Sequence, residues 1–226
     1  MVWPQRWYDA LMCPPSLHAR TAKRGPYHRL VAALIAGGNP GADAQSDARR
    51  QSLLAGLRGH VLEIGPGGGP NLAYFAPTVT WTGVEPNPYM HPYLLRRAAQ
   101  LGRAVDLRLG VAEELPVDDA CQDAVVATLV LCSVQDPQRV LAEVLRVLKP
   151  GGNFVFVEHV AAAPDSLLRR VQNAINPLWR RIADGCHANR ETWATISAAG
   201  FSQVTLEHYN TNLPLVTPHI AGIARK

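Results

Sequence analysis

Short apolar runs alternate with amphipathic stretches along most of the chain after residue 60. Four runs have the length and the aliphatic or aromatic content of strands buried on both faces of a sheet, and most are followed by a helical pattern. These runs read HVLEIG, VTWTGVEP, DAVVATLVLCSV and NFVFVEHV. Alternation of this kind predicts an α/β fold with a doubly wound, mostly parallel sheet.

The stretch that begins at Asp136 carries a strong helix signal. Asp136 is a good N-cap, Pro137 suits the first turn, and apolar residues then recur at helical spacing as Val140, Leu141, Val144, Leu145 and Leu148. Near the end of the chain, QVTLEHY (203–209) and HIAGIARK (219–226) have the composition of strands. We expect these two segments to pair antiparallel.

The first 50 residues differ from the rest of the chain. A helical piece is followed by AGGNPGADAQSDARR (36–50), whose Gly, Pro, Asn and Asp content predicts a flexible connection. We therefore expect residues 1–50 to form a helical lid with its connection, and residues 51–226 to form one α/β domain. At 226 residues the chain is long enough to bury a full core.

Composition and charge narrow the functional classes. No apolar run reaches the roughly 20 residues of a membrane span, and the N-terminus lacks an apolar signal core, so we predict no integral membrane span and a cytoplasmic location. The net charge is +4, and residues 1–60 hold eight Lys/Arg against three Asp/Glu. This excess is too small for nucleic-acid binding. It fits either an anionic partner or membrane surface, or the solvated face of a lid helix.

The four cysteines stand at positions 13, 121, 132 and 186, without a CxxC pair and without the spacing of a metal site. This usage predicts free thiols in a reducing compartment and no bound metal. Cys132 follows a strongly apolar run, so we expect it in the core.

The segment GPGGGP (65–70) directly follows the first predicted strand. In an open parallel sheet, a glycine-rich loop at this position lets a ligand approach the backbone. Glu85 ends the second predicted strand 20 residues after Gly65, where a carboxylate can accept hydrogen bonds from both hydroxyls of a ribose. Together these features predict a site for an adenosine-containing cofactor, whereas a plain turn beside a solvated Glu85 is the alternative.

The loop departs from the dinucleotide pattern GxGxxG, because Pro70 stands where the last glycine would fall. Glu63, Gly65, Gly67 and Gly69 instead resemble the ExGxGxG motif of the class I S-adenosylmethionine-dependent methyltransferases. The resemblance implies a Rossmann-like fold with seven strands, S-adenosyl-L-methionine as cofactor and S-adenosyl-L-homocysteine as product.

The resemblance also implies roles for single residues. Glu63 would lie near the methionine portion of the cofactor, the glycine backbone would run past it, and Glu85 would hold the ribose. Ala112 and Glu113 would flank the adenine, and Leu129 would lie at the end of the fourth strand of the family. The cofactor-binding set implied in this way is Glu63, Gly65, Pro66, Gly67, Gly69, Glu85, Pro86, Asn87, Ala112, Glu113 and Leu129.

Four further motifs, TLVLCSV, VEHVAA, DGC and RETW, resemble the small-molecule thiol S-methyltransferases over roughly residues 60–226. The resemblance implies methyl transfer to a small-molecule thiol. Transfer to oxygen, nitrogen or carbon of a secondary metabolite remains an alternative, as does a cofactor-binding module without catalysis. The chain carries no [DNS]PPY-like tetrapeptide and no Pro-Cys nucleophile, which argues against nucleic-acid methylation.

A general base would be needed only for an acceptor that keeps its proton, and histidine is the first choice because its pKa lies near neutrality. His159 lies at the carboxyl end of the predicted strand NFVFVEHV, where it is either a base or a structural histidine; Asp184 is the second catalytic candidate. The resemblance places Cys186 and His187 over the acceptor pocket, although Cys186 also fits a small buried thiol. Tyr8, His18 and Tyr27 are candidates for substrate contacts from the lid, or for packing within it.

Overall fold

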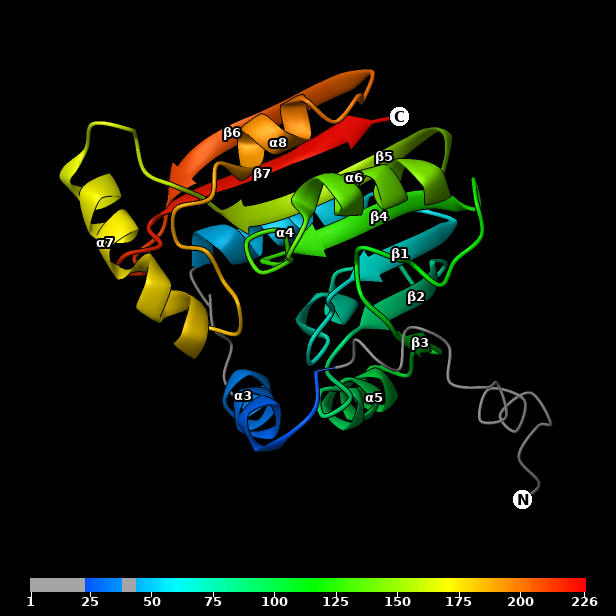
Figure 1. The fold of residues 1–226 in the computed structure, drawn as a ribbon. Helices are drawn as coiled ribbons and strands as arrows, with labels where there is room; N and C mark the ends of the chain where they lie inside the picture. The colour runs from blue at the N-terminus through cyan, green and yellow to red at the C-terminus, as the bar shows by residue number, and fades with distance from the viewer. Residues whose placement is uncertain (1–22, 38–43) are drawn as a thin grey trace.

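The computed structural model describes residues 23–37 and 44–226. Within these residues, seven strands form one sheet in the order β3-β2-β1-β4-β5-β7-β6 (Figure 1). β7 is antiparallel to both of its neighbours, and all other neighbouring strands are parallel. The strands are β1 (His60–Ile64), β2 (Thr80–Glu85), β3 (Asp106–Leu109), β4 (Gln122–Thr128), β5 (Leu148–His159), β6 (Gln203–Asn210) and β7 (Pro218–Arg225).

Helices cover both faces of this sheet. On one face, α6 (Pro137–Val147) and α8 (Thr192–Ser197) share a core with β4 and β5 that includes Phe154 and Phe156. On the other face, α4 (Ala44–Ala55), the short 3₁₀ helix η1 (Pro70–Ala73) and α5 (His91–Gln100) bury Leu54, Leu72 and Leu94. The remaining helices, α3 (Pro26–Gly37) and α7 (Leu167–Ile182), lie on the side to which the arrowheads of β1, β4 and β5 point in Figure 1.

The winding of the sheet reverses between β1 and β4, which are hydrogen-bonded neighbours. Ligands of open α/β sheets bind at such a reversal, outside the carboxyl ends of the strands. The loops that follow β1, β2, β4 and β5 all meet at this end. The glycine-rich segment, Glu85 and His159 are therefore on the same edge of the sheet.

The predicted sheet and its antiparallel final pair are confirmed. The helix after Asp136 is confirmed as well: the Asp136 side chain accepts hydrogen bonds from the backbone N–H groups of Gln138 and Arg139, and Pro137 is in the first turn. Its buried stripe holds Val140, Leu141, Val144 and Val147, whereas Leu148 already belongs to β5.

The predicted flexible connection over 36–50 is wrong in part. α3 continues to Gly37, and α4 begins at Ala44, where it buries Arg50 and Leu54. This helix is stabilised by its packing on the sheet, which polar composition alone does not reveal. The candidates Tyr8 and His18 lie outside the described residues, as do Cys13 and the connecting residues 38–43.

Candidate functional site

The glycine-rich loop after β1 adopts a backbone that side chains disfavour. Gly65, Gly67 and Gly69 all have left-handed φ values, of 59°, 54° and 77°. A Cβ atom on Gly65 would lie 2.8 Å from Val130, and one on Gly69 would lie 2.9 Å from Leu72. A Cβ on Gly67 would meet no atom within 4 Å. Two of the glycines are thus required by packing, while the backbone at Gly67 borders open space.

Glu85 connects this loop to the loop after β2. Its carboxylate accepts hydrogen bonds from the backbone N–H groups of Gly67 at 2.9 Å and Asn87 at 2.8 Å. The side chain is buried, and burial raises its pKa to about 7 against the opposing effects of these hydrogen bonds and of Lys23. The carboxylate therefore lies between the two segments that are predicted to hold the cofactor.

Glu63, the acid that precedes the glycines in β1, is held by other side chains. One carboxylate oxygen accepts a hydrogen bond from Asn71 Nδ2, the other from Trp81 Nε1, each at 2.9 Å. Burial raises the pKa of Glu63 to about 7. Glu63 thus holds η1 against β2. The contact of Glu63 with the cofactor stays a prediction.

The remaining predicted cofactor-binding residues follow β3 and β4. Ala112 is buried, and one carboxylate oxygen of Glu113 accepts a hydrogen bond from the backbone N–H of Gln135 at 2.8 Å. Leu129 has a left-handed φ of 57°, and its N–H donates to Val157. Glu113 thus holds the backbone just before α6 in place. Leu129 turns the chain where β4 ends.

The segment at the start of α3 lies against both cofactor loops. The backbone N–H of Lys23 donates to Pro86, and Asn87 Nδ2 donates to the carbonyl of His28 at 3.0 Å. A Cβ on Gly68 would lie 3.5 Å from the Cβ of Ala36. α3 therefore covers Pro86, Asn87 and the glycine-rich loop, as a lid on this site would.

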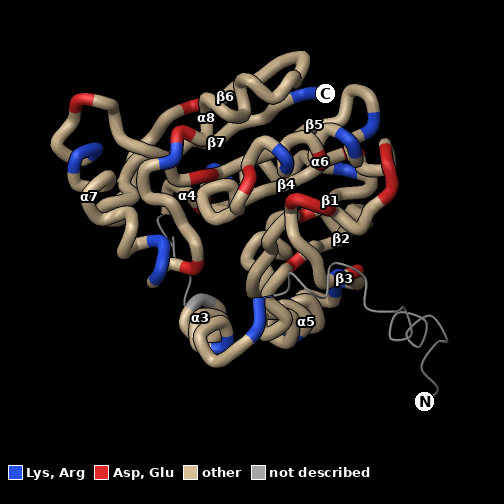
Figure 2. Tube along the Cα trace, viewed as in Figure 1, with Lys and Arg blue, Asp and Glu red and all other residues tan. Residues whose placement is uncertain are grey.

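Asp184 joins the same segment to the loop after α7. Lys23 Nζ lies 2.7 Å and His28 Nδ1 lies 3.2 Å from its carboxylate oxygens, and its backbone N–H donates to the hydroxyl of Tyr27. Figure 2 shows positive positions at the end of α7 and just before α3, on either side of an acidic one. Asp184 is thus an anchor for α3, and Tyr27 takes part in that contact through its hydroxyl.

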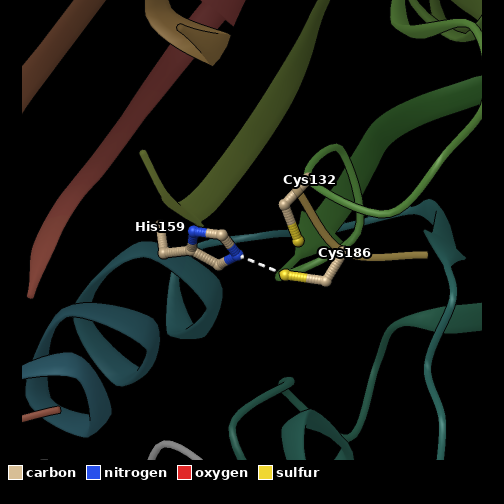
Figure 3. Close-up of side chains that lie close together, drawn as sticks. All are labelled: Cys132, His159 and Cys186. Carbon is tan, nitrogen blue, oxygen red and sulfur yellow. Dashed lines mark hydrogen bonds between the residues drawn. The ribbon is translucent and has the colours of Figure 1, made fainter. Parts of the chain in front are cut away.

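His159 and Cys186 are brought together, and Cys132 joins them (Figure 3). His159 Nε2 lies 3.0 Å from Cys186 Sγ, and Trp179 Nε1 donates a hydrogen bond to the same sulfur at 3.2 Å. The pKa of the Cys186 thiol is raised by its contact with Cys132 and by burial. Cys132 is in the core, as predicted, but it also contributes to this cluster, which its apolar surroundings did not reveal.

His187 and Arg190 hold the loop after α7 in place. The backbone N–H of His187 donates to the carbonyl of Cys132, and Arg190 Nη1 donates to the carbonyls of Leu131 and Val134. Burial and two nearby arginines lower the pKa of His187 to about 4. Its imidazole is therefore neutral at pH 7, so it adds no positive charge to this loop.

Glu158 is a residue that the predicted site omitted. One of its carboxylate oxygens accepts hydrogen bonds from the N–H groups of Val130 and Leu131, at 2.9 and 3.0 Å. The other oxygen is buried and has no hydrogen-bond partner among the described residues. Glu158 precedes His159 at the end of β5, and this position in the sequence could have identified it as a site residue. Glu158 fixes the loop after β4, which carries Cys132.

Comparison with known proteins decides the family. Residues 62–156 match the model described as "Methyltransferase domain". The chain is 40% identical over 171 residues to the human thiol S-methyltransferase TMT1A, covering 74% of this chain and 70% of that protein. It is 44% identical over 172 residues to the rat thiol S-methyltransferase TMT1B, covering 74% and 70%. The chain belongs to this methyltransferase family.

A solved structure of a protein from Bacillus halodurans shares the fold. Its TM-score is 0.65 at 19% identity, and the match covers 81% of this chain and 99% of that one. Members of the family use S-adenosyl-L-methionine as methyl donor. The geometry fits this cofactor, because the backbone at Gly67 is open and the Glu85 carboxylate lies beside it.

None of the helices within residues 23–37 and 44–226 has both the length and the hydrophobicity that crossing a membrane requires.

Proposed function

We propose that this methyltransferase transfers the methyl group of S-adenosyl-L-methionine to the thiol of a small molecule. The observation that carries the proposal is the identity of 40% and 44% to two thiol S-methyltransferases over about three quarters of the chain. S-adenosyl-L-homocysteine is the second product.

The cofactor supplies an activated methyl group on its sulfonium. The proposed task of Glu85 is to accept hydrogen bonds from the ribose, with Gly65, Pro66, Gly67 and Gly69 passing along the cofactor and Pro86 and Asn87 closing one side. Ala112 and Glu113 are assigned to the adenine, and Leu129 to a cofactor contact at the end of β4. Glu63 supports this arrangement through Asn71 and Trp81.

The acceptor is assigned to the far side of the glycine-rich loop, at the ends of β4 and β5. Val130 lies against Gly65, and the cluster of Cys132, His159 and Cys186 follows directly. An ordinary thiol has a pKa near 8.5, so a fraction is thiolate at neutral pH. Holding this thiolate in line with the methyl group, in a site without water, supplies most of the required catalysis.

We assign the segment that ends with α3 to a lid and begin the catalytic domain at α4, before the predicted boundary at residue 51, because α4 packs on the sheet. Two contacts support the lid for its described part: Lys23 bonds to Pro86 on the cofactor side, and its side chain pairs with Asp184 on the acceptor side. A segment that touches both sides can exclude water once both ligands are bound. Tyr27, His187 and Cys186 border the acceptor side in this assignment, and we place the protein in the cytoplasm.

The test is a turnover screen that measures S-adenosylhomocysteine formation with small thiols, phenols, amines and indoles at equal concentration. Turnover with thiols alone is expected. Turnover that is confined to a phenol, an amine or an indole would replace the proposal with O-, N- or C-methylation. Tight binding of S-adenosylhomocysteine without turnover of any acceptor would instead point to a cofactor-binding module.

A further inference from the structure

Three side chains that can bind a metal ion converge from separate parts of the chain. Cys132 follows β4, His159 ends β5, and Cys186 lies in the loop between α7 and α8. Their ligand atoms all lie within 4.8 Å of one another (Figure 3). The three residues are only 2%, 5% and 9% exposed, so the group is shielded from bulk solvent.

The spacing of these atoms is close to that of a tetrahedral zinc site. With Zn–S bonds of about 2.3 Å and Zn–N bonds of about 2.0 Å, two sulfurs would be about 3.8 Å apart and a sulfur and a nitrogen about 3.5 Å. His159 Nε2 and Cys186 Sγ, now 3.0 Å apart, would need to separate by about half an ångström. Side-chain rotation provides such a shift without movement of the backbone.

The surroundings suit thiolate ligands. Trp179 Nε1 donates a hydrogen bond to Cys186 Sγ at 3.2 Å, which stabilises negative charge on that sulfur. Arg190 lies close by, with its guanidinium bound to the carbonyls of Leu131 and Val134 on either side of Cys132. The backbone bond from His187 to Cys132 keeps the two cysteine-bearing loops together.

The ligand types favour one metal ion, and three ligands leave its coordination shell one ligand short. Two thiolates and one imidazole favour Zn²⁺ among the common divalent ions. Three protein ligands leave a fourth position, which is the arrangement of catalytic rather than structural zinc sites. Among the described residues, no fourth His, Cys, Asp or Glu belongs to the group.

We propose that Cys132, His159 and Cys186 bind one Zn²⁺ ion and that the thiolate of the methyl acceptor takes its fourth position. The second half of this statement rests on the proposed thiol S-methyltransferase function. It replaces a general base by a metal: in this arrangement His159 is a ligand through Nε2 and removes no proton.

The chemical step balances without another reactant. The acceptor thiol releases its proton to solvent as its sulfur binds Zn²⁺. The zinc-bound sulfur forms a bond to the methyl carbon, while the bond from that carbon to the cofactor sulfonium breaks and its electron pair stays on the cofactor sulfur. The products are a neutral thioether, which is a weak ligand and leaves the metal, and S-adenosylhomocysteine.

Metal content is the first measurement. The purified full chain is stripped with a chelator, titrated with ZnCl₂ alone, and assayed for bound zinc by mass spectrometry; CoCl₂ serves as the spectroscopic probe. We expect about one ion per chain, and sulfur-to-cobalt charge-transfer absorption. Cys132→Ser, His159→Ala and Cys186→Ser should each lower the zinc affinity at least 10- to 100-fold. Cys121→Ser, which changes a cysteine outside the group, should leave it unchanged.

Thermal unfolding provides a test that does not depend on whether the ligand variants fold. ZnCl₂ should raise the melting temperature of the wild type and of Cys121→Ser, since it binds only the folded state. The site is overturned if the wild type neither binds zinc nor shows the cobalt absorption. It is equally overturned if the untreated protein contains a disulfide between Cys132 and Cys186 in place of the metal.

Addition of a small thiol to the cobalt protein tests the fourth position. The visible spectrum should change with thiol but not with the matching alcohol. An unchanged spectrum would overturn acceptor binding at the metal. Full thiol methylation by metal-free protein would overturn the inference while the proposed function stands, whereas a cobalt spectrum that responds to thiols without any methylation would refute the function.

Discussion

Lys23 Nζ lies 2.7 Å from a carboxylate oxygen of Asp184, and this ion pair joins the segment before α3 to the loop after α7. The same lysine donates its backbone N–H to Pro86, which follows Glu85, the residue that we assign to the ribose of the cofactor. One residue thus touches both sides of the site. The ion pair is partly buried, with side-chain exposures of 30% and 22%, so it is worth on the order of 1 kcal/mol.

Lys23→Gln should lower kcat/KM for the acceptor by roughly 5-fold and leave the affinity for S-adenosylhomocysteine within about 2-fold. The substitution removes the ion pair but keeps the backbone bond to Pro86. Steady-state kinetics and calorimetry measure the two effects. Arg49→Gln is the matched control, because its ion pair with Glu207 lies away from the site. A loss of cofactor affinity equal to the loss of turnover would contradict this role for the lid.

Glu85→Gln should weaken S-adenosylhomocysteine binding by roughly 10- to 100-fold, that is about 1.5–3 kcal/mol. The substitution removes the charged acceptor that we assign to the ribose, while the amide still has one oxygen for the N–H of Gly67 or Asn87. Calorimetric titration gives the difference directly. Glu207→Gln serves as the control for loss of one carboxylate. Unchanged affinity in Glu85→Gln would place the ribose elsewhere.

Whether a feature of the site could be predicted from the sequence depends on how far apart in the chain the interacting residues lie. The glycine-rich loop and Glu85 were predicted because the motif is local and because strand ends fix a 20-residue spacing. The pairing of Lys23 with Asp184 spans 161 residues, and it depends on where α3 lies against the loop after α7. No local pattern encodes that placement.

The cysteine cluster shows the same limit. Cys132 and Cys186 have no metal-like spacing, and each alone is a typical small buried residue. They meet because β4 and β5 are parallel neighbours, which brings Cys132 to His159, and because the His187 backbone binds back to Cys132. α4 was missed for a related reason, since its stability comes from contact with the sheet rather than from its own composition.

Gly67→Ala and Gly69→Ala should separate binding from folding. Both positions have left-handed φ values, so each alanine costs about 1–2 kcal/mol in backbone strain. At Gly69 the new Cβ would also overlap Leu72 and Leu94, which should add about 1–3 kcal/mol. We therefore expect the lower melting temperature in Gly69→Ala. Relative to its loss of stability, Gly67→Ala should lose more affinity for S-adenosylhomocysteine than Gly69→Ala does, because the methyl group at position 67 would enter the open space.

Denaturant unfolding and calorimetry on the two variants decide this comparison. The reverse order, with Gly67→Ala the less stable and Gly69→Ala the poorer binder, would show that the open space at Gly67 does not face the cofactor.

The affinity for S-adenosylhomocysteine should rise with pH up to about 7 and level off above it. Burial raises the pKa of Glu85 to about 7 in the free protein. Lys23 opposes this shift, while Asp184 adds to it; Glu63 and His91 are the other titratable neighbours. Ribose hydroxyls donate to the ionised carboxylate, so binding lowers this pKa and releases a proton.

Because binding releases a proton, the affinity increases with pH. At pH 6 the ionisation of Glu85 lowers the net binding free energy, whereas at pH 8 Glu85 is already ionised. Calorimetry in two buffers of different ionisation enthalpy measures the released proton at pH 6.5. Glu85→Gln should bind weakly at every pH and release no proton, whereas Glu207→Gln should behave as the wild type does. An affinity that falls between pH 6 and 7, or proton uptake on binding, would show that the buried Glu85 carboxyl does not meet the ribose.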